Sequence, residues 1–193
     1  MQYGLECEFF VRRGSDIIGA LDASLTPDEC GFLAEARGKP QWSILEAVFS
    51  LKADIHRLNV AATKLGLTLV CEPLVNVPRN EILKSRRVFS KGRLEYQNLY
   101  GYKEHKNRGK KTGGIHISFT NPRETYVDGE LVGTYNHIFD FVQIFRKLDL
   151  AFKDEIKSAG RYPGFYELKP DGRIEYRSLP NNVDLLKVVE VLS

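Results

Sequence analysis

Residues 3–11 carry the sequence YGLECEFFV, and this stretch decides the fold. Its aromatic residues favour a β-strand, in which successive side chains point to opposite faces. Leu5, Cys7 and Phe9 then share one face, whereas Glu6 and Glu8 share the other. Two carboxylates held about 7 Å apart along a strand repel each other unless a cation or an arginine lies between them. We therefore expect a strand with one apolar face and one acidic face that requires a positive partner.

Hydrophobic periodicity and turn residues predict the elements around this strand. Further strands are expected at residues 32–37, 67–71, 115–120, 164–168 and 173–178, and a hairpin at 125–133. Helices are expected at residues 43–65, 136–152 and 183–192. A capping box of Ser43 and Glu46 begins the first helix, and Gly66 ends it. The order predicts one domain over residues 1–193, an α+β fold with a curved antiparallel sheet that forms a concave active site and is covered on its other face by two long helices.

Composition narrows the class of protein. The 193 residues are 42% hydrophobic and 27% charged, which suits one soluble globular domain. A net charge of +3 does not by itself imply a nucleic-acid partner. No apolar stretch approaches a membrane span, and the N-terminal residues lack the pattern of a signal peptide, so we expect a cytoplasmic protein. Cys7, Cys30 and Cys71 form no CxxC pair, which favours buried free thiols.

Charged residues interrupt three other predicted strands in the same alternating way. Glu35 and Arg37 share a face, His116 lies in an apolar strand, and Glu175 and Arg177 share a face. If all these strands belong to one sheet, their polar faces converge in one site. Carboxylates with a single histidine suit Mg²⁺ or Mn²⁺ rather than Zn²⁺, and two arginines suit the recognition of a carboxylate or phosphate.

Each cluster also has a simpler explanation when it is taken alone. A pair of glutamates on a strand is common on a solvated sheet face, and a single histidine in a strand is usually structural. Glu175 and Arg177 on their own are typical of a surface ion-pair ladder. The combination of the four clusters, rather than any one of them, indicates a metal site.

That combination resembles the glutamine synthetase and glutamate–cysteine ligase superfamily of carboxylate–amine ligases, and especially its compact amidoligases from phages and bacteria. The segment GLECEFF at residues 4–10 is similar to the family's G-x-E-x-E-F strand. The segment DECGFLAEAR at 28–37 is similar to its D-x-x-G-x-x-x-E-x-R motif. The segments GGIHIS at 113–118 and GRIEYRSLP at 172–180 resemble its histidine strand and its late R-I-E-x-R motif. The motifs span nearly the whole chain.

The resemblance implies a fold like the glutamine synthetase catalytic domain and an ATP-dependent reaction that forms an amide through an acyl phosphate. It implies that Glu6, His116 and Glu175 hold the Mg²⁺ or Mn²⁺ that bridges the ATP phosphates. Glu8 and Glu35 would hold a metal nearer the carboxylate substrate, with an amine as the second substrate. A further family glutamate is missing here, and Asp28 is the nearest stand-in. The expected setting is the cytoplasm of a bacterium or a phage-infected cell.

The resemblance also implies that Arg177 contacts the transferring phosphoryl group or the substrate carboxylate. Arg37 and Arg161 are further candidates for contacts with phosphate or carboxylate in the same cleft. Arg108, Lys110 and Lys111 precede the histidine strand and are candidates for phosphate binding, with Gly114 allowing close approach of the backbone. A solvated basic loop explains these residues equally well.

Two other classes of protein remain open. Basic and aromatic residues alternate between Lys84 and Lys111, which is typical of nucleic-acid-binding grooves, although nucleic acid is not the expected partner. A metal-dependent nuclease would combine this stretch with the acids. An inactive relative that keeps only the fold is the third alternative. The sequence leaves the oligomeric state undecided.

Overall fold

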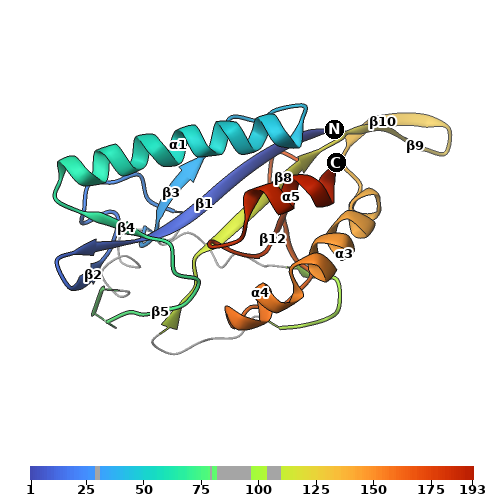
Figure 1. The fold of residues 1–193 in the computed structure, drawn as a ribbon. Helices are drawn as coiled ribbons and strands as arrows, with labels where there is room; N and C mark the ends of the chain where they lie inside the picture. The colour runs from blue at the N-terminus through green and yellow to red at the C-terminus, as the bar shows by residue number, and fades with distance from the viewer. Residues whose placement is uncertain (29–30, 79, 82–96, 104–109) are drawn as a thin grey trace.

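The computed structural model describes residues 1–28, 31–78, 80–81, 97–103 and 110–193, and the account below concerns these residues (Figure 1). Its α-helices are α1 (Ile44–Lys64), α3 (Val142–Ala151), α4 (Lys153–Ser158) and α5 (Leu185–Leu192), with a 3₁₀ turn η1 (Ile138–Asp140). The main strands are β1 (Gln2–Arg13), β3 (Ala34–Arg37), β8 (Gly114–Thr120), β11 (Phe165–Leu168) and β12 (Ile174–Pro180). The shorter or outlying strands are β2 (Asp16–Ile18), β4 (Thr68–Val70), β5 (Val75–Asn76), β6 (Gln97–Asn98), β7 (Lys110–Lys111), β9 (Arg123–Val127) and β10 (Glu130–Tyr135).

One sheet organises the molecule, and β1 pairs with four of its strands. The order β2-β1-β8-β12-β11-β6 runs across the sheet, and β3 and β4 also pair with β1. Every strand pair of this sheet in the described residues is antiparallel. The predicted α+β class with an antiparallel sheet is therefore confirmed.

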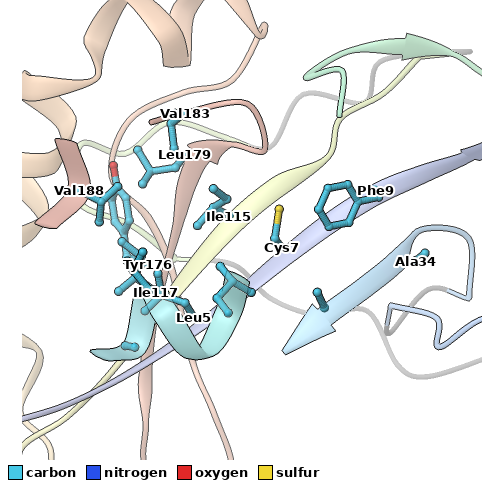
Figure 2. Packing of buried hydrophobic residues seen from close by; sticks show 14 of the residues in the cluster. Leu5, Cys7, Phe9, Ala34, Ile115, Ile117, Tyr176, Leu179, Val183 and Val188 are labelled. Carbon is cyan, nitrogen blue, oxygen red and sulfur yellow. The ribbon is translucent and has the colours of Figure 1, made fainter. Parts of the chain in front are cut away.

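The helices pack on the apolar face of β1, as its alternation predicts. Leu5, Cys7 and Phe9 lie in a buried cluster with side chains from α1, α3 and α5. Figure 2 shows them gathered with side chains from β8 and β12, and Figure 1 shows α1, α3 and α5 lying on one side of the sheet. A smaller cluster that includes Phe10 and Phe32 lies apart from this core. The sheet thus separates a helix-covered face from the face that carries Glu6 and Glu8.

The helix predictions need three corrections. Ser43 begins α1, but its side chain makes no capping hydrogen bond, so the predicted capping box is wrong. The predicted helix at 136–152 is instead the 3₁₀ turn η1 followed by α3, with Phe141 at φ −107° and ψ −12° between them. Phe152, at φ −116° and ψ 21°, then separates α3 from α4. Only α1 is long, so the second long helix is replaced by shorter ones. Gly66 follows α1 at φ +67°, as expected for a helix end.

The remaining local predictions have mixed outcomes. Asp128 and Gly129 both adopt positive φ in the turn between β9 and β10, which confirms the predicted hairpin. In Figure 1 this hairpin extends away from the sheet and helices. Cys7 is buried and free as predicted, whereas Cys71, just past the end of β4, is exposed. Cys30 lies outside the described residues.

None of the helices in the described ranges is long and apolar enough to cross a membrane.

Candidate functional site

Strand register brings the predicted acidic residues together on the face opposite the helices. Across the pair β1–β3, Glu6 lies opposite Arg37 and Glu8 lies opposite Glu35. Across the other edge of β1, Glu6 lies opposite His116 of β8. Residues directly opposite each other in antiparallel strands point to the same face. Three segments far apart in the sequence therefore contribute to one polar cluster, which we call the acidic pocket.

His116 occupies the middle of the acidic pocket and is almost completely buried, with 2% of its surface exposed. Its Nδ1 lies 3.8 Å from Glu6 Oε2 and 3.7 Å from Glu175 Oε1. Its Nε2 lies 3.7 Å from Glu8 Oε2. These separations are too long for hydrogen bonds, and Nδ1 has no hydrogen-bond partner in the structure. The imidazole is thus surrounded by carboxylates without being bonded to them.

Strand β12 adds Glu175 and Arg177 to the same face. Glu175 lies opposite Ser118 of β8, and a bulge then shifts the register between Tyr176 and Leu179. Glu175 is fully buried, and the Arg177 guanidinium contacts its Oε1. The predicted convergence of Glu175 and Arg177 with the residues of β1 and β8 is therefore present in the structure.

Two residues that the sequence did not predict, one in β11 and one in the turn after it, also belong to this polar face. Glu167, which lies opposite Glu175, and Lys169 extend the polar face beyond β12. Lys169 Nζ lies 3.0 Å from Glu167 Oε2 and 3.4 Å from Glu175 Oε2, and Arg177 Nη1 lies 3.1 Å from Glu167 Oε2. The available signal was the alternation of Glu167 and Lys169 with Tyr166 and Leu168, the same pattern that identified Glu6 and Glu8.

Burial dominates the electrostatics of the acidic pocket. It raises the pKa of Glu8 to about 7, although Arg177 and Arg161 act in the opposite direction. Burial and the neighbouring Glu6 raise the pKa of Glu35 to about 9, against the effect of Arg37. For both carboxylates, burial thus outweighs the effect of the neighbouring arginines on the pKa.

Burial also lowers the pKa of His116 well below its usual range, an effect that Arg177 reinforces and Glu175 opposes. The imidazole is therefore neutral at physiological pH. A neutral imidazole has a lone pair that can coordinate a metal ion.

The donor set of the acidic pocket fits a hard divalent cation. One ligand atom each from Glu6, Glu35 and His116 lie within 4.8 Å of one another. Ligands around an ion with bonds of about 2.1 Å lie roughly 3–4 Å apart, so small side-chain movements would close such a group. The unpartnered Nδ1 of His116 is the observation that favours a missing ligand over a merely structural cluster. Glu8 and Glu175 flank the group.

Gly114, the first residue of β8, holds the Glu8 carboxylate in place. Gly114 N donates a hydrogen bond to Glu8 Oε2 at 2.9 Å. A side chain on Gly114 would meet Arg161 Nη2 at 2.9 Å and His116 Nε2 at 3.1 Å. The predicted close approach of the backbone at Gly114 is thus made to protein groups.

Arg161 contacts residues 112–113, just before β8, and donates hydrogen bonds mainly to backbone oxygens. Its Nε donates to Ser178 O at 3.1 Å, and its Nη1 donates to Thr112 Oγ1 at 3.1 Å and Gly113 O at 3.3 Å. These bonds connect the segment before β8 to β12. The predicted contact of Arg161 with a substrate phosphate stays a prediction.

Two other predicted residues, Arg37 and Asp28, lie at the margin of the site. Arg37 is bonded to Glu35, and its side chain is half exposed. Asp28 Oδ1 accepts hydrogen bonds from Phe32 N at 2.8 Å and Leu33 N at 3.0 Å, so this carboxylate also closes the turn before β3.

The basic segment is described only in part. Lys110 and Lys111 form β7, which pairs with Val75 and Asn76 of β5, but their side chains are not described. Arg108 and most of the Lys84–Lys111 stretch lie outside the described residues. The predicted phosphate contacts of these residues stay predictions.

Comparison of the chain with protein-family models and with curated proteins finds no match.

Proposed function

We propose that this protein is an ATP-dependent carboxylate–amine ligase that forms an amide bond at a site requiring Mg²⁺ or Mn²⁺. One observation carries the proposal: Glu6, Glu35 and the unpartnered His116 converge on a buried sheet face beside two arginines. Carboxylate-rich sites for hard cations commonly serve phosphate-bearing substrates. The ordered motifs of the sequence narrow that class to carboxylate–amine ligases with a fold like the glutamine synthetase catalytic domain.

Glu6, Glu35 and His116 would hold the cation, which when bound supplies positive charge to the phosphate oxygens of ATP. Arg37 is the residue best placed to contact a substrate carboxylate, because its side chain is 51% exposed while its guanidinium is fixed by Glu35. A guanidinium so oriented presents a planar fork to an incoming carboxylate. Arg177 is more enclosed, and it would act on groups that enter close to Glu175.

The reaction has two displacements. The substrate carboxylate attacks the γ-phosphorus of ATP, which forms an acyl phosphate and releases ADP. The amine then attacks the acyl carbon, phosphate leaves, and the nitrogen loses one proton as the amide forms. The residues of the acidic pocket contribute by positioning the reactants and by stabilising negative charge rather than by forming a covalent bond.

The test is isothermal titration of the protein with Mn²⁺ and then with ATP in the presence of Mn²⁺. We expect ATP binding that requires the metal, and loss of both events in Glu6→Gln. Glu6 suits this substitution because its side chain is 19% exposed, so the fold should survive. Glu190→Gln on the exposed surface of α5 is the matched control and should bind as the wild type does.

Two results would overturn the proposal. The first is absence of Mn²⁺ and Mg²⁺ binding by folded wild-type protein at millimolar concentration. The second is metal binding without ATP binding, combined with salt-dependent binding or cleavage of single-stranded DNA, which would support the nuclease alternative instead.

A further inference from the structure

The polar face divides into two parts with different charge balance. One part is the acidic pocket around Glu6, Glu8, Glu35 and His116. The other is a group of four side chains from β11, the turn after it and β12, which we call the quartet: Glu167, Lys169, Glu175 and Arg177. The resemblance on which the proposed function rests implies two metal ions, so it matters which carboxylates still lack a cation.

The quartet combines two carboxylates with two cationic side chains. Its side chains are nearly or fully buried, with exposures of 8% for Glu167, 9% for Lys169, 0% for Glu175 and 14% for Arg177. Lys169 Nζ bridges the two carboxylates at 3.0 and 3.4 Å, and Arg177 bridges the same pair from its Nη1. Two carboxylates thus face two cations, and the carboxylate oxygens facing Lys169 already have a positive partner.

The acidic pocket has fewer positive partners than carboxylates. Arg37 Nε lies 3.8 Å from Glu6 Oε1, and the same guanidinium contacts Glu35. Glu6 and Glu35 thus share one guanidinium, and one oxygen of each lies with a ring nitrogen of His116 in a group whose atoms are within 4.8 Å of one another. Among the residues that the structure describes, His116 Nδ1 has no hydrogen-bond partner, so this is where a cation still finds ligands.

We propose that the site holds one divalent cation, at Glu6, Glu35 and His116, and that the ammonium group of Lys169 takes the place of a second. The inference rests on the metal dependence in the proposed function and deepens it. Lys169 is a positioning residue here: it fixes Glu175 Oε2 together with Ser118, whose hydroxyl lies 3.3 Å from the same oxygen. Glu175 then binds Lys169 and Arg177 within the quartet and is not a ligand shared between two metal ions.

This assignment has a specific consequence for a chain that lacks Lys169. Among the residues that the structure describes, removing the ammonium leaves Arg177 as the remaining cation in contact with the buried Glu167 and Glu175. A buried carboxylate without a partner is costly, and a divalent cation can relieve that cost when space is available. Truncation of Lys169 should therefore create a second metal site in place of the lost ammonium.

The experiment counts Mn²⁺ ions bound per chain by electron paramagnetic resonance of the free ion, with dialysed protein at saturating Mn²⁺. We expect one ion for the wild type, one for Lys169→Arg and two for Lys169→Ala. Lys169→Gln is a second variant of similar length, and it should also bind a second ion. Thermal melts with and without Mn²⁺ establish that each variant is folded.

Lys187→Ala is the matched control, because Lys187 Nζ also lies close to a glutamate, 2.8 Å from Glu155, but does so from α5. It should bind one ion. Two ions in the wild type, or one ion in the folded Lys169→Ala and Lys169→Gln variants, would overturn the inference and leave the proposed ligase function standing. Absence of Mn²⁺ binding by the wild type would overturn both.

Discussion

Glu35 and Glu8 remain protonated at pH values at which an exposed glutamate is ionised. Burial raises the pKa of Glu35 to about 9 and that of Glu8 to about 7, whereas the unfolded chain titrates both groups near 4.3. Between these values the folded chain binds more protons than the unfolded chain. Linkage then requires that Glu35 and Glu8 lower the free energy of unfolding of the metal-free protein as pH rises from about 5 to 9, whereas the lowered pKa of His116 acts in the opposite direction below about pH 6.5.

Urea unfolding at pH 5, 7 and 9 in the presence of a chelator measures this dependence. Glu35→Gln should flatten the decline between pH 7 and 9, because the amide has no proton to lose. Saturating Mn²⁺ should oppose the decline, since the metal binds the deprotonated carboxylates. A metal-free protein whose stability is constant or rises over this range would contradict the assignment of the raised pKa values to these two residues.

At the same scale, the sequence predicted the direction of side chains better than their partners. Glu6 and Glu8 had to share a face because a strand alternates, and the structure has them so. Glu167 and Lys169 follow the same alternation. They lie beside Glu175 only because β11 pairs with β12, and the local sequence pattern does not encode that pairing. The capping box failed for a related reason, since Ser43 has the right residue type without the required contact.

At the scale of elements, the segment before β8 fits its surroundings without spare room. A side chain on Gly113 would lie 2.5 Å from Asn181 Nδ2 and 3.1 Å from the backbone oxygen of Glu8. Asn181 cannot move away freely, because its Nδ2 donates to that same oxygen at 3.0 Å. At Gly114 the obstructing atoms belong to the side chains of Arg161 and His116.

We therefore predict that Gly113→Ala lowers the free energy of unfolding by about 1–3 kcal/mol, the usual range for overpacking, and by more than Gly114→Ala does. Gly114→Ala should instead weaken Mn²⁺ binding more than Gly113→Ala, because its new methyl group presses on His116. Chemical denaturation and Mn²⁺ titration of both variants check the two orders. Gly129→Ala in the β9–β10 turn, which meets nothing within 4 Å although its φ is positive, separates backbone strain from crowding.

Helix boundaries show where element prediction stops. Apolar spacing alone is continuous from Ile138 through Phe152, and it predicts one helix. The structure divides the segment into η1 and α3, which are separated at Phe141 by φ −107° and ψ −12°. The backbone of Phe152, at φ −116° and ψ 21°, then separates α3 from α4. Hydrophobic periodicity shows which residues face the core. It does not show a change in chain direction between two segments that both pack against the core.

At the scale of the whole molecule, the sheet has the hydrophobic core on one face and the candidate site on the other. Tyr176 lies between Glu175 and Arg177 but points to the opposite face, where its hydroxyl donates to Asp149 Oδ1 at 2.7 Å. Tyr176→Phe should lower the free energy of unfolding by about 1–2 kcal/mol, since Asp149 keeps hydrogen bonds from Gly164 and Tyr100. Mn²⁺ affinity should stay within about twofold of the wild type, given that tenfold corresponds to about 1.4 kcal/mol.

Thermal or urea unfolding together with Mn²⁺ titration tests this separation. Tyr166→Phe on the neighbouring strand is a matched control, because it removes a less buried tyrosine hydroxyl that donates to Gln97. Loss of Mn²⁺ affinity in Tyr176→Phe greater than the loss in stability would show that the two faces of β12 are coupled.

The architecture of the site also constrains the order in which the protein can fold. Strand β1 emerges from the ribosome well before β8, with which it forms its long pairing, and β8 in turn pairs with the still later β12. Such non-local pairings slow folding, because the chain must close large loops before the contacts form. The edge of β1 that pairs with β8 therefore stays unpaired until β8 has been synthesised. Glu6 and Glu8, whose burial is costly in the folded sheet, repel other chains during that interval. They thereby protect an exposed strand from premature association.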